Sequence, residues 1–328
     1  MTGARRGLLS SPQAAGAGLI IFAAAGFGTL GPLARYADDA GVTSLALVTW
    51  RAGVGAALMV GFLLLRRAAG HRPAKRWSDL PVRDRRFVIG GALTNAVLNL
   101  AVFIAFVRIG IALSLLIFYI YPAFVALVSA LWFGERLDRL RWAALGISLA
   151  GAVLVVAGGG ALGSLDLLGI GLAFVGALAQ TFYALAARHA FSAVPGPQAA
   201  AVTMGGAAGI YVAVAVVTGQ LGAVAFPLGD SAALWPVLLA GLLGAALPTV
   251  SFIVGIRLLG APRATILSTL EPVVGVSLAA LLFNELPTAV QIAGGVLIVA
   301  AGVLLQLRPR GAVAEHEAVV GSDVPGDA

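Results

Sequence analysis

Long apolar runs alternate with short polar segments along almost the whole chain. Since a membrane-crossing helix needs about 20 predominantly apolar residues, this pattern predicts an all-α polytopic membrane protein with ten transmembrane helices. We place the helices at residues 14–36, 43–65, 87–107, 111–133, 141–157, 167–187, 198–218, 232–256, 262–284 and 288–307. The terminal segments 1–12 and 308–328 lack apolar periodicity and are interpreted as tails.

The positive charges of the loops fall on one side of these helices. With the N-terminus in the cytoplasm, the inside segments contain 18 of the Lys and Arg residues, and the outside segments contain only Arg108. Lys and Arg accumulate in the cytoplasmic loops of membrane proteins. The sequence therefore predicts a multi-pass protein of the cytoplasmic (inner) membrane with both termini in the cytoplasm.

The composition excludes a soluble protein. Hydrophobic residues make up 60% of the chain and charged residues 11%, against about 25% charged residues in a soluble domain. The lipid bilayer is thus the expected partner. The chain has a net charge of +7, but no basic stretch is interleaved with aromatic residues in an exposed module. No nucleic-acid partner is therefore expected. Whether the chain is a monomer or a homodimer is left open.

Two matches to nucleotide-binding motifs are rejected on their context. The stretches GFGTLG (26–31) and GGGALG (158–163) fit the dinucleotide fingerprint, but neither lies between a strand and a helix of a βαβ unit. The second also lacks the lysine of a P-loop. The chain has no cysteine, and its three histidines lie in predicted loops or a tail. We therefore expect no cofactor, no metal site and no ATP-driven transport.

The chain repeats itself at a constant offset of 150 residues. When residues 110–157 are set over 260–307, ten of 48 positions are identical, including Pro122 with Pro272 and Glu135 with Glu285. This divides the molecule into a first repeat, 13–157, and a second repeat, 164–307. Five helices is an odd number, so the second repeat enters the membrane from the opposite side. Inverted repeats of this kind are associated with secondary transporters.

These motifs resemble a known family. The Trp-Arg pair at 50–51, the prolines followed by glutamate at the ends of helices four and nine, and the stretches GERL (134–137) and NELP (284–287) resemble the drug/metabolite transporter superfamily, EamA type. The resemblance covers about 14–307. It implies two inverted five-helix repeats and export of small metabolites, amino acids or drug-like compounds, driven by an ion gradient.

Glu271 is the acid that lies well inside a predicted span. Its repeat counterpart is Tyr121, so the carboxylate does not belong to the repeated scaffold, and Pro272 opens the helix next to it. Ionisable residues in the bilayer are costly and commonly functional. Glu271 is either a substrate or coupling residue, a role that the resemblance favours, or a protonated residue that packs one helix against another.

Arg51 is the cation buried in the second predicted span. Its depth places it near Glu271, so it either pairs with that acid, meets an anionic group of the substrate, or extends outward to Asp38 or Asp39 as an anchor. Other polar residues that could line the same cavity are Trp50, Asn95, Asn99, Tyr119, Tyr121, Gln180, Tyr183, Tyr211, Thr249, Ser268 and Thr269. Each of these could instead serve interhelical hydrogen bonding.

Glu135 and Glu285 recur in both repeats and are interpreted as structural, together with Pro122 and Pro272. Each glutamate lies just ahead of the next helix, for which Asp138 and Thr288 are the expected N-caps. We expect the two carboxylates to accept hydrogen bonds from backbone donors of these tight turns.

The sequence favours a secondary active transporter that exports a small-molecule substrate by alternating access, coupled to protons or working as an exchanger. The alternative is an uncoupled facilitator or channel for small amphipathic solutes. An enzyme is not expected, because a membrane enzyme would need clustered acids, histidines or arginines at one bilayer face, and the loop charges are dispersed.

Overall fold

A computed structural model describes residues 12–70, 77–135, 138–158, 166–189, 194–284 and 286–306. Within these residues the regular structure is helical throughout and no strand occurs. Eight helical segments are long and apolar enough to cross a membrane, and Tyr121–Trp132 and Ala289–Leu304 are shorter apolar helices. The expected class, an all-α multi-pass membrane protein, is confirmed.

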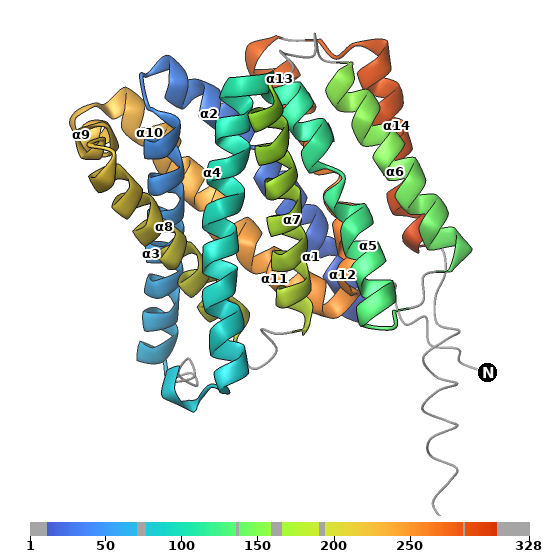
Figure 1. Cartoon of the computed structure of the whole chain (residues 1–328), viewed down its shortest axis with the longest axis horizontal. Coiled ribbons are helices and arrows are strands. Elements are labelled where there is room, and N and C mark those ends of the chain that lie inside the picture. Colours follow the sequence, from blue (N-terminus) through green and yellow to red (C-terminus); the bar gives the residue numbers. More distant parts are fainter. Residues whose placement is uncertain are drawn as a thin grey trace, which may run out of the picture.

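Most of the helices run side by side as a bundle (Figure 1). Their bounds are α1 Pro12–Gly28, α2 Leu30–Asp39, α3 Ser44–Ala68, α4 Val82–Phe118, α5 Tyr121–Trp132, α6 Arg139–Ala157, α7 Leu167–His189, α8 Gly196–Val217, α9 Leu221–Ala225, α10 Ser231–Gly241, α11 Leu247–Leu259, α12 Ala261–Ser268, α13 Glu271–Phe283 and α14 Ala289–Gln306. A π-helical turn, Leu242–Ala246, joins α10 to α11.

Three of the predicted spans are interrupted rather than continuous. The first divides into α1 and α2, the eighth contains the π turn, and the ninth divides into α12 and α13. A proline follows each interruption within four residues, namely Pro32, Pro248 and Pro272. Proline has no N–H to donate, so the carbonyl four residues earlier loses its helical partner and the ladder opens there.

The predicted boundary between the third and fourth spans, at residues 108–110, is not a break in the helix. α4 is helical from Val82 to Phe118. It nevertheless folds back on itself, because a Cβ built at Gly176 of α7 would lie 2.6 Å from the Val102 side chain and 3.8 Å from the Phe118 ring. Sixteen residues of straight helix would separate those two side chains by about 24 Å. The expected reversal is present, but helical hydrogen bonding continues through it.

The repeat is visible in the backbone at the ends of α5 and α13. Gly134 and Asn284, which are 150 residues apart, both adopt the left-handed conformation, with φ of 64° and 57°. Glycine and asparagine tolerate this region better than other residues do. The first residues of the GERL and NELP stretches therefore end the two helices in the same way.

The expected N-caps of the following helices are confirmed. The Asp138 carboxylate accepts a hydrogen bond from the Arg141 N–H at 2.9 Å. The Thr288 hydroxyl accepts from the Gln291 N–H at 3.2 Å, and the Gln291 side chain accepts from the Thr288 N–H at 2.9 Å. The second arrangement is a capping box, in which the two residues satisfy each other's backbone donors.

The helix contacts also correspond between the two repeats. α4 packs on α7, and the corresponding pair in the other half, α11 with α1, is also in close contact. α5 against α7 corresponds in the same way to α13 against α1. α3 packs on its own counterpart, α8, and α6 packs on its own counterpart, α14. The structure thus pairs each half with the other rather than folding each half separately.

Glycines permit the closest of these contacts. A Cβ on Gly151 of α6 would lie 2.7 Å from the carbonyl oxygen of Gly294 in α14, and a Cβ on Gly294 would lie 2.6 Å from that of Gly151. Atoms do not approach so closely without displacement, so only glycine fits at this crossing. Small residues that let backbones meet are typical of membrane helix interfaces.

We expect Gly151→Ala to lower the thermal stability of the protein, because its new methyl group would push α6 and α14 apart, at a cost of roughly 1–3 kcal/mol. Gly146→Ala, on the same helix, is the matched control, since a Cβ there meets nothing within 4 Å. It should be neutral or stabilising, given that alanine favours a helix over glycine by about 1 kcal/mol. Thermal unfolding in detergent measures both variants, and equal shifts would contradict the prediction.

Candidate functional site

The break between α12 and α13 determines where Glu271 lies. Helix α12 ends at Ser268, and α13 begins at Glu271 with Pro272 as its second residue. In the first repeat α4 ends at Phe118, and α5 begins at Tyr121 with Pro122 second. Glu271 therefore lies at a helix N-terminus and not in mid-helix. The positive end of the helix dipole favours a negative charge at that position.

Arg51 of α3 is held by two hydrogen bonds that reach across the bundle. Its Nη1 donates to Oδ1 of Asn99 in α4 at 2.5 Å, and its Nε donates to the Gly244 carbonyl in the π turn at 3.1 Å. The Gly244 carbonyl is available because Pro248, four residues later, has no N–H to offer it. The guanidinium group thus points inward, and none of these bonds goes to Asp38 or Asp39.

Two further residues support the Arg51–Asn99 bond. The Asn99 amide donates to the backbone carbonyl of Asn95 at 2.8 Å and to its side-chain oxygen at 2.7 Å. The Tyr211 hydroxyl of α8 approaches the Asn95 carbonyl at 3.3 Å. Because the Asn99 amide group is fixed in this way, its oxygen faces the arginine. The cluster therefore joins α3, α4 and α8.

Glu271 faces this cluster without pairing directly with it. Its carboxylate acts electrostatically on Arg51, but no ion pair within 4.0 Å joins the two among the residues that the structure describes. It also acts on Tyr119 and Tyr121, and Tyr121 lies beside Ser268. Arg51, Asn99 and Glu271 are half-buried, whereas both tyrosines are buried. Two opposite charges are thus held apart, each with accessible surface.

Other residues expected in the cavity lie elsewhere. The indole N–H of Trp50 donates to the Val224 carbonyl at 2.8 Å, on a face of α3 that differs from that of Arg51. The Tyr183 hydroxyl lies 3.5 Å from that of Thr203, and its ring stacks on Phe252, close to Arg257. Thr249 is buried on α11 and Gln180 is half-buried on α7. No hydrogen bond among the described residues links these four side chains to Arg51 or Glu271.

The turn after α5 contains Glu135, for which the expected hydrogen bonds to backbone donors of the turn stay a prediction. Its carboxylate lies 3.6 Å from Nε2 of His189, the last residue of α7. Burial raises the pKa of Glu135, and the positive charges of Arg188 and Arg141 counteract that shift. Glu135 thus links the end of α5 to the end of α7. Glu285 lies outside the described residues.

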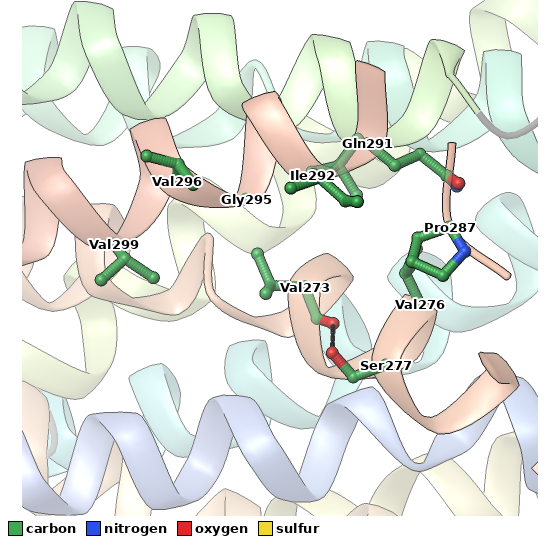
Figure 2. A pocket seen from close by; sticks show the side chains of 10 residues that line it. Val273, Val276, Ser277, Pro287, Gln291, Ile292, Gly295, Val296 and Val299 are labelled. Carbon is green, nitrogen blue, oxygen red and sulfur yellow. Dashed lines mark hydrogen bonds between the residues drawn. The ribbon is translucent and has the colours of Figure 1, made fainter. Parts of the chain in front are cut away.

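A groove between α13, α14 and α6 is separate from the charged cluster (Figure 2). It encloses about 340 Å³ and is lined by Val155, Val273, Val276, Ser277, Pro287, Gln291, Ile292, Gly295, Val296 and Val299. The Ser277 hydroxyl donates to the Val273 carbonyl of its own helix. The groove has no charged residue in its lining, so it offers little for recognition of a polar solute.

Comparison with protein families identifies the chain. The model of the EamA-like transporter family matches residues 14–157 and, a second time, residues 167–307. The chain belongs to the EamA-like transporter family. EamA-like transporters are not a class of enzyme, and the cluster around Arg51 and Glu271 is accordingly a candidate transport site.

Individual relatives of this EamA-like transporter agree with that assignment. The uncharacterized transporter sll1319 of Synechocystis sp. (strain ATCC 27184 / PCC 6803 / Kazusa) is 30% identical over 202 residues, which are 60% of this chain and 58% of that protein. The match thus spans less than two thirds of the relative. A crystal structure with 22% sequence identity has a TM-score of 0.71 over 89% of this chain and 96% of that chain, which shows the same fold.

We expect Asn99→Ala to destabilise the protein, because it removes the acceptor of a half-buried charged donor, a loss of about 1–3 kcal/mol. Thr94→Ala is the matched control on the same helix, since within the described part of the chain the Thr94 hydroxyl bonds to carbonyls of its own helix, those of Gly90 and Gly91. Thermal unfolding followed by tryptophan fluorescence compares the two variants. If both lose the same stability, the Asn99 side chain does not support Arg51.

Proposed function

We propose that this EamA-like protein is a secondary active transporter that exports a small amphipathic solute across the cytoplasmic membrane by alternating access. The solute is a metabolite, an amino acid or a drug-like compound. The observation that carries the proposal is the separated pair of charges, Arg51 and Glu271, at the junction of the two repeats. Opposite charges kept apart in a membrane domain suit a solute that supplies both partners.

The proposed topology has ten crossings in two inverted five-helix repeats, with both termini in the cytoplasm. It is supported by the reversal inside α4, by the matching breaks before Tyr121 and Glu271, and by a helix pairing that is unchanged when the halves are exchanged. The excess of Lys and Arg in the predicted inside loops supports the orientation.

In this mechanism Arg51 binds a carboxylate of the solute and Glu271 binds either its ammonium group or a proton. Arg51 is suited to the first task because its guanidinium is fixed by Asn99 and by the Gly244 carbonyl. A proton and an ammonium group cannot both occupy the same carboxylate site. Their competition at Glu271 would couple solute movement in one direction to proton movement in the other.

An uncoupled facilitator is the second candidate. The cluster contains a single carboxylate among the described residues, and a carrier needs no coupling ion if the solute moves down its own gradient. Both candidates use the same binding site. They differ only in whether a proton gradient can drive accumulation.

Binding should require both charges of the solute. A neutral amino acid that binds should raise the thermal stability of the detergent-solubilised protein. When its amine is acetylated or its carboxylate is converted to an amide, we expect the same rise to need a ligand concentration higher by about tenfold or more. Each change leaves Glu271 or Arg51 unpartnered, a loss of roughly 1.4 kcal/mol or more in binding free energy. A panel of neutral amino acids with both derivatives of each is the test. Equal stabilisation by the derivatives would contradict two-charge recognition.

Glu271→Gln should abolish solute accumulation driven by an imposed pH gradient in proteoliposomes, because glutamine binds no proton. Exchange of solute for solute should continue, but only at a solute concentration that is higher by about tenfold or more, because the ammonium group loses its charged partner. Ser277→Ala, on the same helix, is the control, since among the residues that the structure describes the Ser277 hydroxyl bonds to the Val273 carbonyl of its own helix. If Glu271→Gln retains pH-driven accumulation, Glu271 is not the coupling residue. If the unsubstituted protein never accumulates solute, the facilitator is correct.

A further inference from the structure

At the C-terminal end of each of the helices α5 and α13, a phenylalanine rests on a planar nitrogen-bearing side chain of a neighbouring helix. Phe133, directly after α5, stacks parallel to the His189 ring of α7, with 3.8 Å between ring centroids and 2° between planes. Phe283, the last residue of α13, lies under the Arg35 guanidinium of α2, 4.3 Å from ring centroid to Cζ. The Tyr36 ring also contacts Phe283, at 5.1 Å.

These two contacts are equivalent under the repeat. Phe133 and Phe283 are 150 residues apart, in the register that also aligns Pro122 with Pro272. The partner helices correspond as well, since α7 begins the second repeat as α1 and α2 begin the first. The contacts lie at opposite edges of the bundle, with α2 at the upper edge and the junction of α5 and α6 at the lower edge (Figure 1).

Each helix connects its contact to the candidate transport site. α5 begins at Tyr121 and α13 begins at Glu271, and the Glu271 carboxylate acts electrostatically on both Tyr121 and Arg51. With 12 and 13 residues, the helices are rods of about 18–20 Å. A tilt of either rod about its end at the site would separate its phenylalanine from the partner helix, because the break before each rod leaves it free of a rigid continuation.

We propose that the stacks of Phe133 on His189 and of Phe283 on Arg35 are the two gates of the transporter, one at each membrane face. Separation of Phe133 from His189 opens the site toward the face at which α7 ends, and separation of Phe283 from Arg35 opens it toward the face of α2. The inference rests on the proposed function, because gates have a role only if the central site is loaded from one face and unloaded at the other.

The two gates have different accessory contacts. Glu135 lies 3.6 Å from His189 at the first gate. At the second, Trp235 of α10 packs on Tyr36 with 5.1 Å between ring centroids, so a third helix joins the closure. At the second gate the Arg35 guanidinium over the Phe283 ring adds a cation–π attraction to the aromatic contacts. Such contacts are strong enough to hold a state closed and weak enough to separate during transport.

The absence of cysteine from the sequence makes the gates directly testable. Ser268→Cys places a single thiol beside Tyr121, at a buried position that labels slowly while both gates are closed. Labelling with a membrane-impermeant maleimide is then measured from each face of oriented vesicles, without any solute. With Phe133→Ala added, we expect a several-fold faster reaction from the face of His189 only, and with Phe283→Ala from the face of Arg35 only.

Phe124→Ala is the matched control, since Phe124 also joins α5 to α7, through Phe174 at 5.6 Å, but away from the helix end. It should label like the Ser268→Cys background, and Phe133→Tyr should restore slow labelling if the stack is the gate. The proposal is overturned if neither alanine variant exceeds Phe124→Ala, or if both accelerate labelling from the same face. Labelling does not depend on transport, so the two proposals can fail separately. If the protein accumulates solute but the alanine variants label no faster, the gates are rejected and the proposed function stands. If each alanine variant labels faster from its own face but the protein accumulates no solute, the proposed coupling is rejected and the gates stand.

Discussion

A proline in a membrane helix leaves one carbonyl without its helical donor, and the candidate site depends on that constraint. The hydrocarbon core supplies no water to replace the missing partner, so a protein group must do so. Pro248 releases the Gly244 carbonyl, and Arg51 satisfies it. The arginine is thereby placed by the backbone of another helix. Pro122 and Pro272 impose the corresponding breaks that set Tyr121 and Glu271 at the starts of their helices.

The sequence predicts the charged residues of the candidate site better than it predicts which other polar side chains lie beside them. Glu271 and Arg51 stood out because a charge deep in an apolar run is costly, and Asn99 because an amide one helical turn from Asn95 shares its face. Trp50 and Tyr183 are predicted to line the same cavity only because they are polar residues within predicted spans. Depth does not give the direction around the helix axis, and both side chains bond to groups outside the cluster.

The sequence also contains a signal for the Gly244 carbonyl. A proline in a predicted span leaves the carbonyl four residues earlier without its helical donor, and Pro248 stands in that relation to Gly244. The reversal in α4 was predicted at the right place, but its continuous helical hydrogen bonding was not. Charged and turn-forming residues indicate that the chain changes direction. Whether the helical hydrogen bonds of α4 continue through that change depends on local geometry, which Gly110 and its neighbours in the sequence do not specify.

The crossing of α6 and α14 at Gly151 and Gly294 has a consequence for motion. The helix pair corresponds to itself under the 150-residue offset, but the contact does not, because Gly151 corresponds to Ala301 and Gly294 to Ala144. Neither glycine can be replaced by a larger residue without displacement, so the backbones of α6 and α14 are held in register at this point. A change of conformation would therefore leave this crossing in place and would have to occur in helices that pack less closely.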